Sequence, residues 1–249
     1  MGKYAAVLFM YNDENRARFV IDNWLTFNSN IPLMVYDGSS IENSIERDYS
    51  DRIEYTCGAN LWHKKTRHPP GSFNYLWFNQ LNICYDYLDE PEYLIFLETD
   101  VKVQSQIVSE PLYDVSGPIT RCGGITDELM MYDFWDAYLK GENFHEDKFT
   151  NWKHKFHSGC GATALSRKFF DCLNKNLDKI KLCYDNIPMH CYQDLVLSCF
   201  ARSAELTLGD WMEVSDTRGT YRRSNRDDDS KWYFDGDYSN KALVHNYKI

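Results

Sequence analysis

The sequence lacks any apolar run close to the roughly 18 residues that a membrane-spanning helix needs. Its eight cysteines include no CxxC pair, the spacing typical of structural zinc sites. Basic residues are also scarce, because 27 Lys and Arg stand against 37 Asp and Glu, which gives a net charge of −10. Phosphate binding needs clustered Lys and Arg. We therefore expect no integral membrane segment, no zinc cluster and no nucleic-acid partner.

The first residues carry one Lys and a short apolar run that soon turns acidic. This pattern predicts a first strand rather than an export signal. Cysteines of a protein that stays in the cytosol remain reduced. We therefore expect eight free thiols and a cytoplasmic protein.

The composition is that of a globular protein, with 43% hydrophobic and 26% charged residues. The apolar run at residues 4–11 predicts a buried strand, and residues 32–36 predict a second one. Between them, Asn12 is expected to be the N-cap of an amphipathic helix. Strand, helix and strand in this order predict a βαβ unit with two parallel strands. We expect a single α/β domain over residues 1–249, with a Rossmann-like, mostly parallel central sheet flanked by helices.

The rest of the chain continues the alternation of strands and helices less regularly. Further predicted elements are a helix from Ser72, a strand at 93–97, a strand and glycine turn entering a helix at 157–170, a helix at 192–204, a strand at 206–214, a loop at 215–240 and a last strand at 242–247.

Two carboxylates follow the most apolar strand. Glu98 and Asp100 stand at positions i and i+2 directly after the run YLIFL, at the edge where open α/β sheets bind ligands. Unpaired carboxylates in a partly buried place are costly, so a hard cation such as Mg²⁺ or Mn²⁺ is a natural partner. The alternative is a strand that reaches solvent and simply ends in acids.

The segment YLIFLETDV resembles the DXD motif of the GT-A-fold glycosyltransferases, with Glu98 in place of the first Asp. The segment HSGCGATALSRKFF (157–170) resembles the glycine-bearing acceptor segment of that family, and implies that Gly159 and Gly161 approach the acceptor. Taken alone, those glycines also fit an ordinary turn between a strand and a helix.

Two later segments follow in the order of that family. The segment HCYQD (190–194) resembles its xED motif, with Gln193 in place of Glu, and implies that Asp194 is the catalytic base. His245 in VHN resembles the metal-binding His that follows the last core strand. Taken alone, Asp194 also fits an acid that merely compensates a helix dipole, and His245 also fits a structural histidine.

The resemblance also implies a donor site near the ends of the first strands. Asn12 and Asp37 resemble positions that contact uracil and ribose, and Lys65 and Asn74 are weaker donor candidates. The donor-binding half is then about 1–103 and the acceptor half about 104–249. Four arginines in the late polar segment either clamp a diphosphate or belong to a solvated surface: Arg218, Arg222, Arg223 and Arg226.

The function implied is a glycosyltransferase, inverting if Asp194 is the base, that needs Mn²⁺ or Mg²⁺. The metal ligands are Asp100, His245 and Glu98, the donor is a nucleotide sugar such as a UDP-sugar, and the acceptor is a glycan or glycoconjugate. Within that family, the expected cytoplasmic location points to a microbial or large-virus enzyme rather than a Golgi one.

Two alternatives remain. A sugar-phosphate nucleotidylyltransferase should have a glycine-rich loop after the first strand, where this chain has YNDENR. A catalytically silent carbohydrate- or nucleotide-binding protein would not need Asp100, Asp194 and His245.

Overall fold

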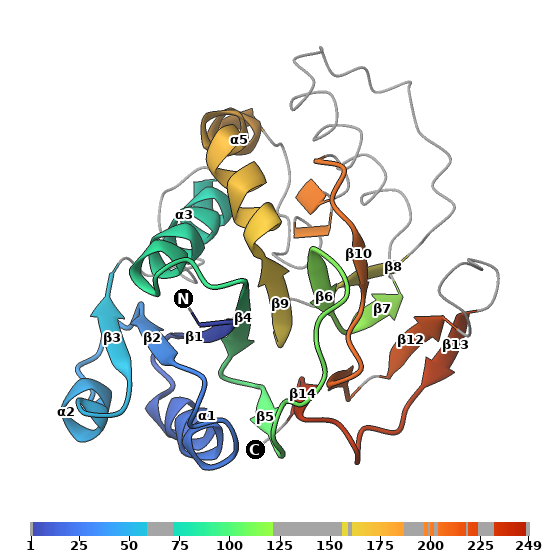
Figure 1. Ribbon diagram of the computed structural model, residues 1–249. Helices are drawn as coiled ribbons and strands as arrows, with labels where there is room; N and C mark the ends of the chain where they lie inside the picture. Colours follow the sequence, from blue (N-terminus) through green and yellow to red (C-terminus); the bar gives the residue numbers. More distant parts are fainter. Residues whose placement is uncertain are drawn as a thin grey trace.

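A seven-stranded, mostly parallel sheet forms the centre of the molecule (Figure 1). The structure is a computed structural model that describes residues 2–58, 72–121, 156–158, 161–186, 197–198, 200–201, 204–217, 219–223 and 232–247. The strands of the large sheet are, in spatial order, β10 (Leu208–Asp210), β6 (Val115–Gly117), β9 (Thr163–Ser166), β4 (Tyr93–Glu98), β1 (Tyr4–Met10), β2 (Leu33–Asp37) and β3 (Glu54–Cys57). Only β9 runs antiparallel to its neighbours in this sheet. The predicted α/β class with a mostly parallel central sheet is confirmed.

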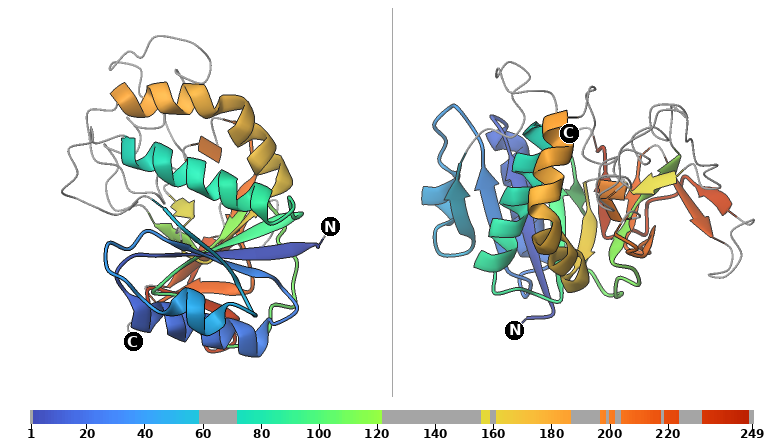
Figure 2. Two further views of the ribbon diagram at one scale, coloured as in Figure 1. Left: turned by 90° about the vertical axis from the view of Figure 1, so that its left-hand side faces the viewer. Right: turned by 90° about the horizontal axis from the view of Figure 1, so that it is seen from above.

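Helices cover both faces of this sheet. Figures 1 and 2 show α3 (Ser72–Tyr87) and α5 (Arg167–Asn186) on one face and α1 (Glu14–Phe27) and α2 (Ile45–Tyr49) on the other. Residues of β1 alternate between the two cores, with Phe9 facing α3 and Leu8 facing α1. A strand buried on both faces must be apolar at every position, which explains the unbroken runs in β1 and β4.

The predicted βαβ unit at the amino terminus is confirmed. β1 pairs in parallel with β2, and α1 connects them. The predicted N-cap is wrong by one residue, because the side chain of Asp13 accepts a hydrogen bond from the backbone N of Arg16 at 3.4 Å. Asn12 instead adopts a left-handed backbone conformation, with φ of 49°.

The helices α3 and α5 each bury an apolar face. Trp77, Leu81 and Cys84 of α3 are buried, and α3 packs against α5 through Tyr85 and Phe170, whose rings stack with centroids 3.8 Å apart. On the inner side of α5, Leu177 is partly buried, and three residues are fully buried: Phe169, Leu173 and Ile180. Of the helix predicted at 192–204, the described residues 197, 198, 200 and 201 are helical, whereas residue 204 lies in a turn.

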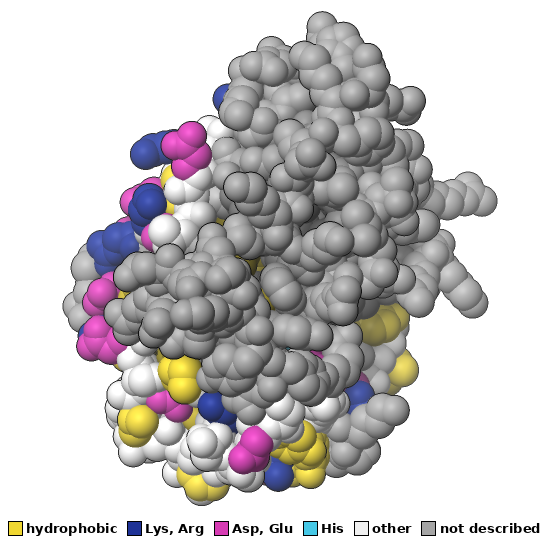
Figure 3. Space-filling model, turned by 90° about the vertical axis from the view of Figure 1, so that its right-hand side faces the viewer, with side chains coloured by type: hydrophobic (Ala, Val, Ile, Leu, Met, Phe, Trp, Pro, Cys, Tyr) yellow, Lys and Arg dark blue, Asp and Glu magenta, His cyan; other side chains and the backbone are white. Residues whose placement is uncertain are grey.

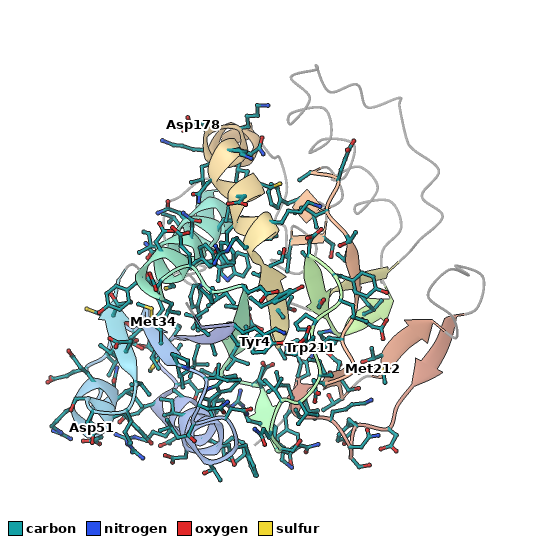
Figure 4. The ribbon with its side chains drawn as sticks, in the orientation of Figure 1. Tyr4, Met34, Asp51, Asp178, Trp211 and Met212 are labelled. Atoms are coloured by element: carbon teal, nitrogen blue, oxygen red, sulfur yellow. The ribbon has the colours of Figure 1, made fainter. Side chains whose placement is uncertain are left out.

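The predictions for the last third of the chain were partly wrong. The strand predicted at 206–214 is two strands, β10 and β11 (Val214–Asp216), which belong to different sheets. The chain turns between them at Trp211, which is buried, and Met212, which lies at the surface (Figure 4). In this turn the backbone N of Val214 donates to the carbonyl of Trp211 at 3.0 Å. Glu213 is also buried, and its carboxylate accepts the backbone N–H groups of Val108 and Ser109.

The predicted loop at 215–240 contains further strands. β12 (Thr220–Arg223) pairs antiparallel with β13 (Trp232–Asp235). β11 lies beside β14 (Leu243–His245), which pairs with β5 (Lys102–Val103) to complete a small three-stranded sheet. Another antiparallel pair joins β7 (Ile119–Arg121) to β8 (Phe156–Ser158). The sequence did not indicate these strands because each is short and contains polar residues. Such strands can still form, since hydrogen bonds between strands do not depend on side-chain hydrophobicity.

The strand order changes direction between β1 and β4. From β1 the chain moves outward through β2 and β3, and then returns to the other side of β1 as β4. Open α/β sheets bind ligands at such a switch point, outside the carboxyl ends of the strands. Here those ends are Met10 and Glu98.

Three cysteines described with their side chains, Cys57, Cys84 and Cys172, are free. Burial raises the pKa of Cys84 to about 12, whereas Cys57 is exposed. We expect a thiol reagent to count about eight thiols in denaturant without reductant, and to modify Cys57 long before Cys84 in the folded protein. Cys57→Ser should remove a rapid phase of the native reaction. A count near zero in denaturant would show disulfides instead.

Candidate metal centre

Glu98, Asp100 and His245 come together where the large sheet meets the small one. Each of the three offers a ligand atom, and these atoms lie within 4.8 Å of one another. Nε2 of His245 is 3.4 Å from Oε2 of Glu98 and 3.6 Å from Oδ1 of Asp100. The three residues predicted as metal ligands therefore form one cluster.

The chain path explains why residues so distant in sequence meet. Glu98 ends β4, and a tight turn, in which the backbone N of Val101 donates to the carbonyl of Glu98 at 3.1 Å, leads directly into β5. β14 then pairs antiparallel with β5, so that its last residue, His245, returns to the turn that carries Asp100. The backbone N of Tyr247 donates to the carbonyl of Asp100 at 2.8 Å and holds the two segments together.

The cluster fits a divalent cation. Oδ1 of Asp100 is buried and accepts no hydrogen bond, which is costly for a carboxylate oxygen unless a cation is its partner. Adjacent ligands of an octahedral ion, each about 2.1 Å from the metal, lie about 3 Å apart, and Nε2 of His245 is only slightly farther than this from Glu98 and Asp100, at 3.4 and 3.6 Å. Two carboxylates and one imidazole are suitable ligands for Mn²⁺ or a related ion.

The electrostatics of the cluster also favour positive charge. Burial alone lowers the pKa of His245, but its hydrogen bond to Asp216 and the nearby charges of Glu98 and Asp100 outweigh burial and raise the pKa to about 10. The carboxylates thus create a strongly negative environment in a place with little water. A cation bound by Glu98 and Asp100 would neutralise the same charge.

Sequence reasoning missed Asp216, the last residue of β11. This residue is fully buried, and its Oδ2 lies 2.9 Å from Nδ1 of His245. The sequence signal for Asp216 was weak, because β11 reads Val-Ser-Asp, with a single apolar residue before the acid, and the surrounding polar residues suggested a loop.

Gly161 lies against the imidazole of His245. A Cβ at this position would be 2.3 Å from Cδ2 and 2.7 Å from Nε2 of the ring. Side-chain atoms essentially never come so close, so the absence of a side chain makes room for His245. The acceptor role predicted for Gly161 stays a prediction, and the contact found here is with the metal cluster.

Replacing Gly161 by Ala is expected to destabilise the protein by about 1–3 kcal/mol, the usual cost of overpacking. It should also weaken Mn²⁺ binding, because the new methyl group covers Nε2 of His245. Thermal unfolding and Mn²⁺ titration would measure both effects.

The control for this substitution is Gly2→Ala, where a Cβ would make only an ordinary contact of 3.6 Å with Tyr4. The destabilisation by Gly161→Ala should shrink when His245 is also replaced by Ala. An equal loss of stability in both backgrounds would contradict the role given to this contact.

Asn12 and Asp37, the predicted nucleoside contacts, lie together at the ends of β1 and β2. Oδ1 of Asn12 accepts the backbone N–H groups of Ser40 at 3.0 Å and Ile41 at 3.2 Å, and thereby holds the loop after β2. Asp37 is buried and accepts hydrogen bonds from Ser39, Asn43 and Tyr55. Burial raises the pKa of Asp37, but these hydrogen bonds more than offset it and lower the pKa below its usual range. Asp37 is therefore an ionised acceptor at neutral pH.

Three further residues named from the sequence lie in described elements. Asn74 belongs to the first turn of α3, and Arg222 and Arg223 belong to β12. Five predicted residues lie outside the described residues: Lys65, Gly159, Asp194, Arg218 and Arg226.

Figure 3 shows the molecule from the right-hand side of Figure 1, and the acidic, basic and apolar side chains of the described residues visible there are interspersed. Among the described residues, no helix has the length and apolar character needed to cross a membrane. No protein-family model matches the chain, and no curated protein matches its sequence at a significant level. The fold and the cluster are therefore the basis for assigning a function.

Proposed function

We propose that the protein is a GT-A-type glycosyltransferase that depends on Mn²⁺ or Mg²⁺. Its donor is a nucleotide diphosphate sugar, with UDP-sugars as the first choice, and its acceptor is a hydroxyl of a glycan or glycoconjugate. The observation that carries the proposal is the cluster of Glu98, Asp100 and His245 at the carboxyl edge of the sheet. We also place the protein in the cytoplasm, in keeping with its free Cys57, Cys84 and Cys172.

The spacing along this edge suits a nucleoside diphosphate. Asp37 pairs with Met10 and Glu98 pairs with Phe9, so the two acids stand on strands separated by β1. Two strand spacings correspond to about 10 Å. A nucleoside bound near Asp37 and Asn12 would therefore extend its diphosphate toward Glu98 and Asp100.

The two ends of this site would bind different parts of the donor. The ionised carboxylate of Asp37 already accepts three hydrogen bonds, and a remaining lone pair can accept one more from a sugar hydroxyl of the nucleoside. Glu98, Asp100 and His245 would hold the divalent ion, which supplies a Lewis acid that neutralises the charge developing on the leaving diphosphate. Without such an ion, the carboxylates would repel the donor, and binding should therefore require the metal.

An acceptor hydroxyl is a weak nucleophile, and its proton must be removed as it attacks the anomeric carbon. We assign this step to Asp194, on its place in the HCYQD segment. A base that activates the acceptor directly implies inversion at the anomeric carbon.

A panel of nucleotide sugars with Mn²⁺, measured by released nucleoside diphosphate, tests the proposal. We expect one donor to be hydrolysed slowly without acceptor and faster with a suitable glycan. Release of pyrophosphate from a nucleoside triphosphate and a sugar phosphate would identify a nucleotidylyltransferase instead. Binding without turnover across the panel would indicate a silent binding protein.

His245→Ala is expected to weaken metal-dependent donor binding about 10-fold or more. Wild-type protein should gain thermal stability from Mn²⁺ plus UDP, because ligands that bind only the folded state stabilise it. The variant should gain much less. Its stability without ligands should also fall, because the buried Asp216 loses a hydrogen-bond partner.

Melting temperatures of both proteins, with and without the two ligands, separate these effects. The difference between the two ligand-induced shifts in melting temperature reports the role of His245 in the site. This difference is independent of any stability that the variant loses without ligands. Equal shifts in both proteins would remove His245 from the metal centre.

A further inference from the structure

Asp216 is a buried acid whose position is tied to His245. The two residues end neighbouring parallel strands, β11 and β14, and they are directly paired in the strand register. Oδ2 of Asp216 lies 2.9 Å from Nδ1 of His245, while Nε2 on the other side of the ring faces Glu98 and Asp100. Asp216 is fully buried and His245 is 7% exposed, so water hardly competes for this contact.

The carboxylate of Asp216 is itself held in place. Nδ2 of Asn246 donates to the same Oδ2 at 3.0 Å, and the backbone N of Asp216 donates to Oγ1 of the buried Thr220 at 3.2 Å. The backbone of the adjacent Thr217 donates to the carbonyl of His245 at 3.0 Å. Asp216 is thus a fixed acceptor and does not need to move to meet the imidazole.

A fixed carboxylate beside Nδ1 determines whether Nε2 carries a proton or a lone pair. When Nδ1 of a neutral imidazole carries the proton and donates a hydrogen bond to Asp216, the lone pair of the ring must lie at Nε2. Only a nitrogen with a lone pair can bind a metal ion. The negative charge of the acceptor also makes Nε2 a better donor of electrons. With no acceptor at Nδ1, the ring could rotate or place its proton on Nε2, and either change would remove the ligand.

We propose that Asp216 is a positioning residue that holds His245 with Nε2 directed at the metal shared by Glu98 and Asp100. This inference rests on the metal centre of the proposed function. Asp216 meets the imidazole at Nδ1, whereas Glu98 and Asp100 face Nε2, so the proposed effect of Asp216 on the metal passes through the imidazole. Its effect should therefore disappear when the imidazole is absent.

A double-mutant cycle with Mn²⁺ alone tests this dependence. Free Mn²⁺ is measured by electron paramagnetic resonance at room temperature for wild type, Asp216→Asn, His245→Ala and the double variant. Asp216→Asn should weaken Mn²⁺ binding about 10–100-fold when His245 is present. In the His245→Ala background the same change should weaken Mn²⁺ binding less than about 3-fold, because only the effect of a lost nearby charge remains.

Each result of the cycle has a defined meaning. An equal effect in both backgrounds, or no effect of Asp216→Asn in either, overturns the inference and leaves the metal centre standing. Wild-type protein that binds no Mn²⁺ overturns both the metal centre and the role of Asp216. Melting temperatures without metal show whether each variant is folded at the temperature of the titration.

Should Asp216→Asn not fold, Asn246→Gly provides a milder version of the same test. Asn246 has a left-handed φ of 56°, which glycine adopts without strain, so this change removes the amide that fixes Asp216 and little else. We expect Mn²⁺ binding to weaken about 2–5-fold with His245 present and to stay unchanged with His245→Ala. Unchanged binding in both backgrounds overturns the inference.

Discussion

Asp100→Asn is expected to lower sugar transfer and donor hydrolysis by about 10³-fold or more. The variant keeps the size of the side chain but loses the charge of the oxygen that lies buried without a hydrogen-bond donor beside His245. Loss of the metal removes several kcal/mol of charge stabilisation from the transition state, which corresponds to a factor of this size. Initial rates at saturating Mn²⁺ measure the effect, and EDTA should abolish the wild-type activity equally.

Asp51→Asn is the matched control for this prediction. It removes the same charge from an exposed side chain in the turn after α2 (Figure 4), whereas the cluster lies at the ends of β4 and β14. Its activity should equal that of wild type, and the far-UV circular dichroism of both variants should be unchanged. Full activity of the wild type in the presence of chelator would contradict the metal-dependent mechanism.

Asp194→Asn is expected to lower kcat by at least about 10²-fold, the usual contribution of a general base. The amide cannot take up the proton of the acceptor hydroxyl, but it leaves the donor site at Asp37, Glu98 and Asp100 intact. The affinity for UDP with Mn²⁺ should therefore change little, while kcat falls. Steady-state kinetics together with calorimetric titration of UDP separate the two quantities.

Asp178→Asn, on the exposed side of α5, provides the matched control for loss of an acid in the second half of the chain. It should leave both kcat and donor affinity unchanged. If Asp194→Asn abolishes UDP binding instead, Asp194 contacts the donor or supports the fold, and the base must be another residue.

Local patterns in the sequence were sufficient for the central sheet and its helices. Unbroken apolar runs mark β1 and β4 because both faces of these strands are buried. Helical periodicity marks α3 and α5 because only one side of each packs against the sheet. The short strands β11 and β12 were missed because three or four residues carry too little pattern to separate a strand from a loop.

For the site, the sequence by itself determined that Glu98 and Asp100 stand at the end of a buried strand and just after it, and that His245 belongs to a late apolar strand. Both facts depend on neighbours within a few residues. Only the tertiary structure decided that these groups meet, that Gly161 makes room for the imidazole and that Asp216 orients it. Asp216 and His245 are 29 residues apart, and their contact depends on the pairing of β11 with β14 and of β14 with β5. Such pairings are chosen by the packing of the whole chain, because short strands can form similar hydrogen bonds with many partners.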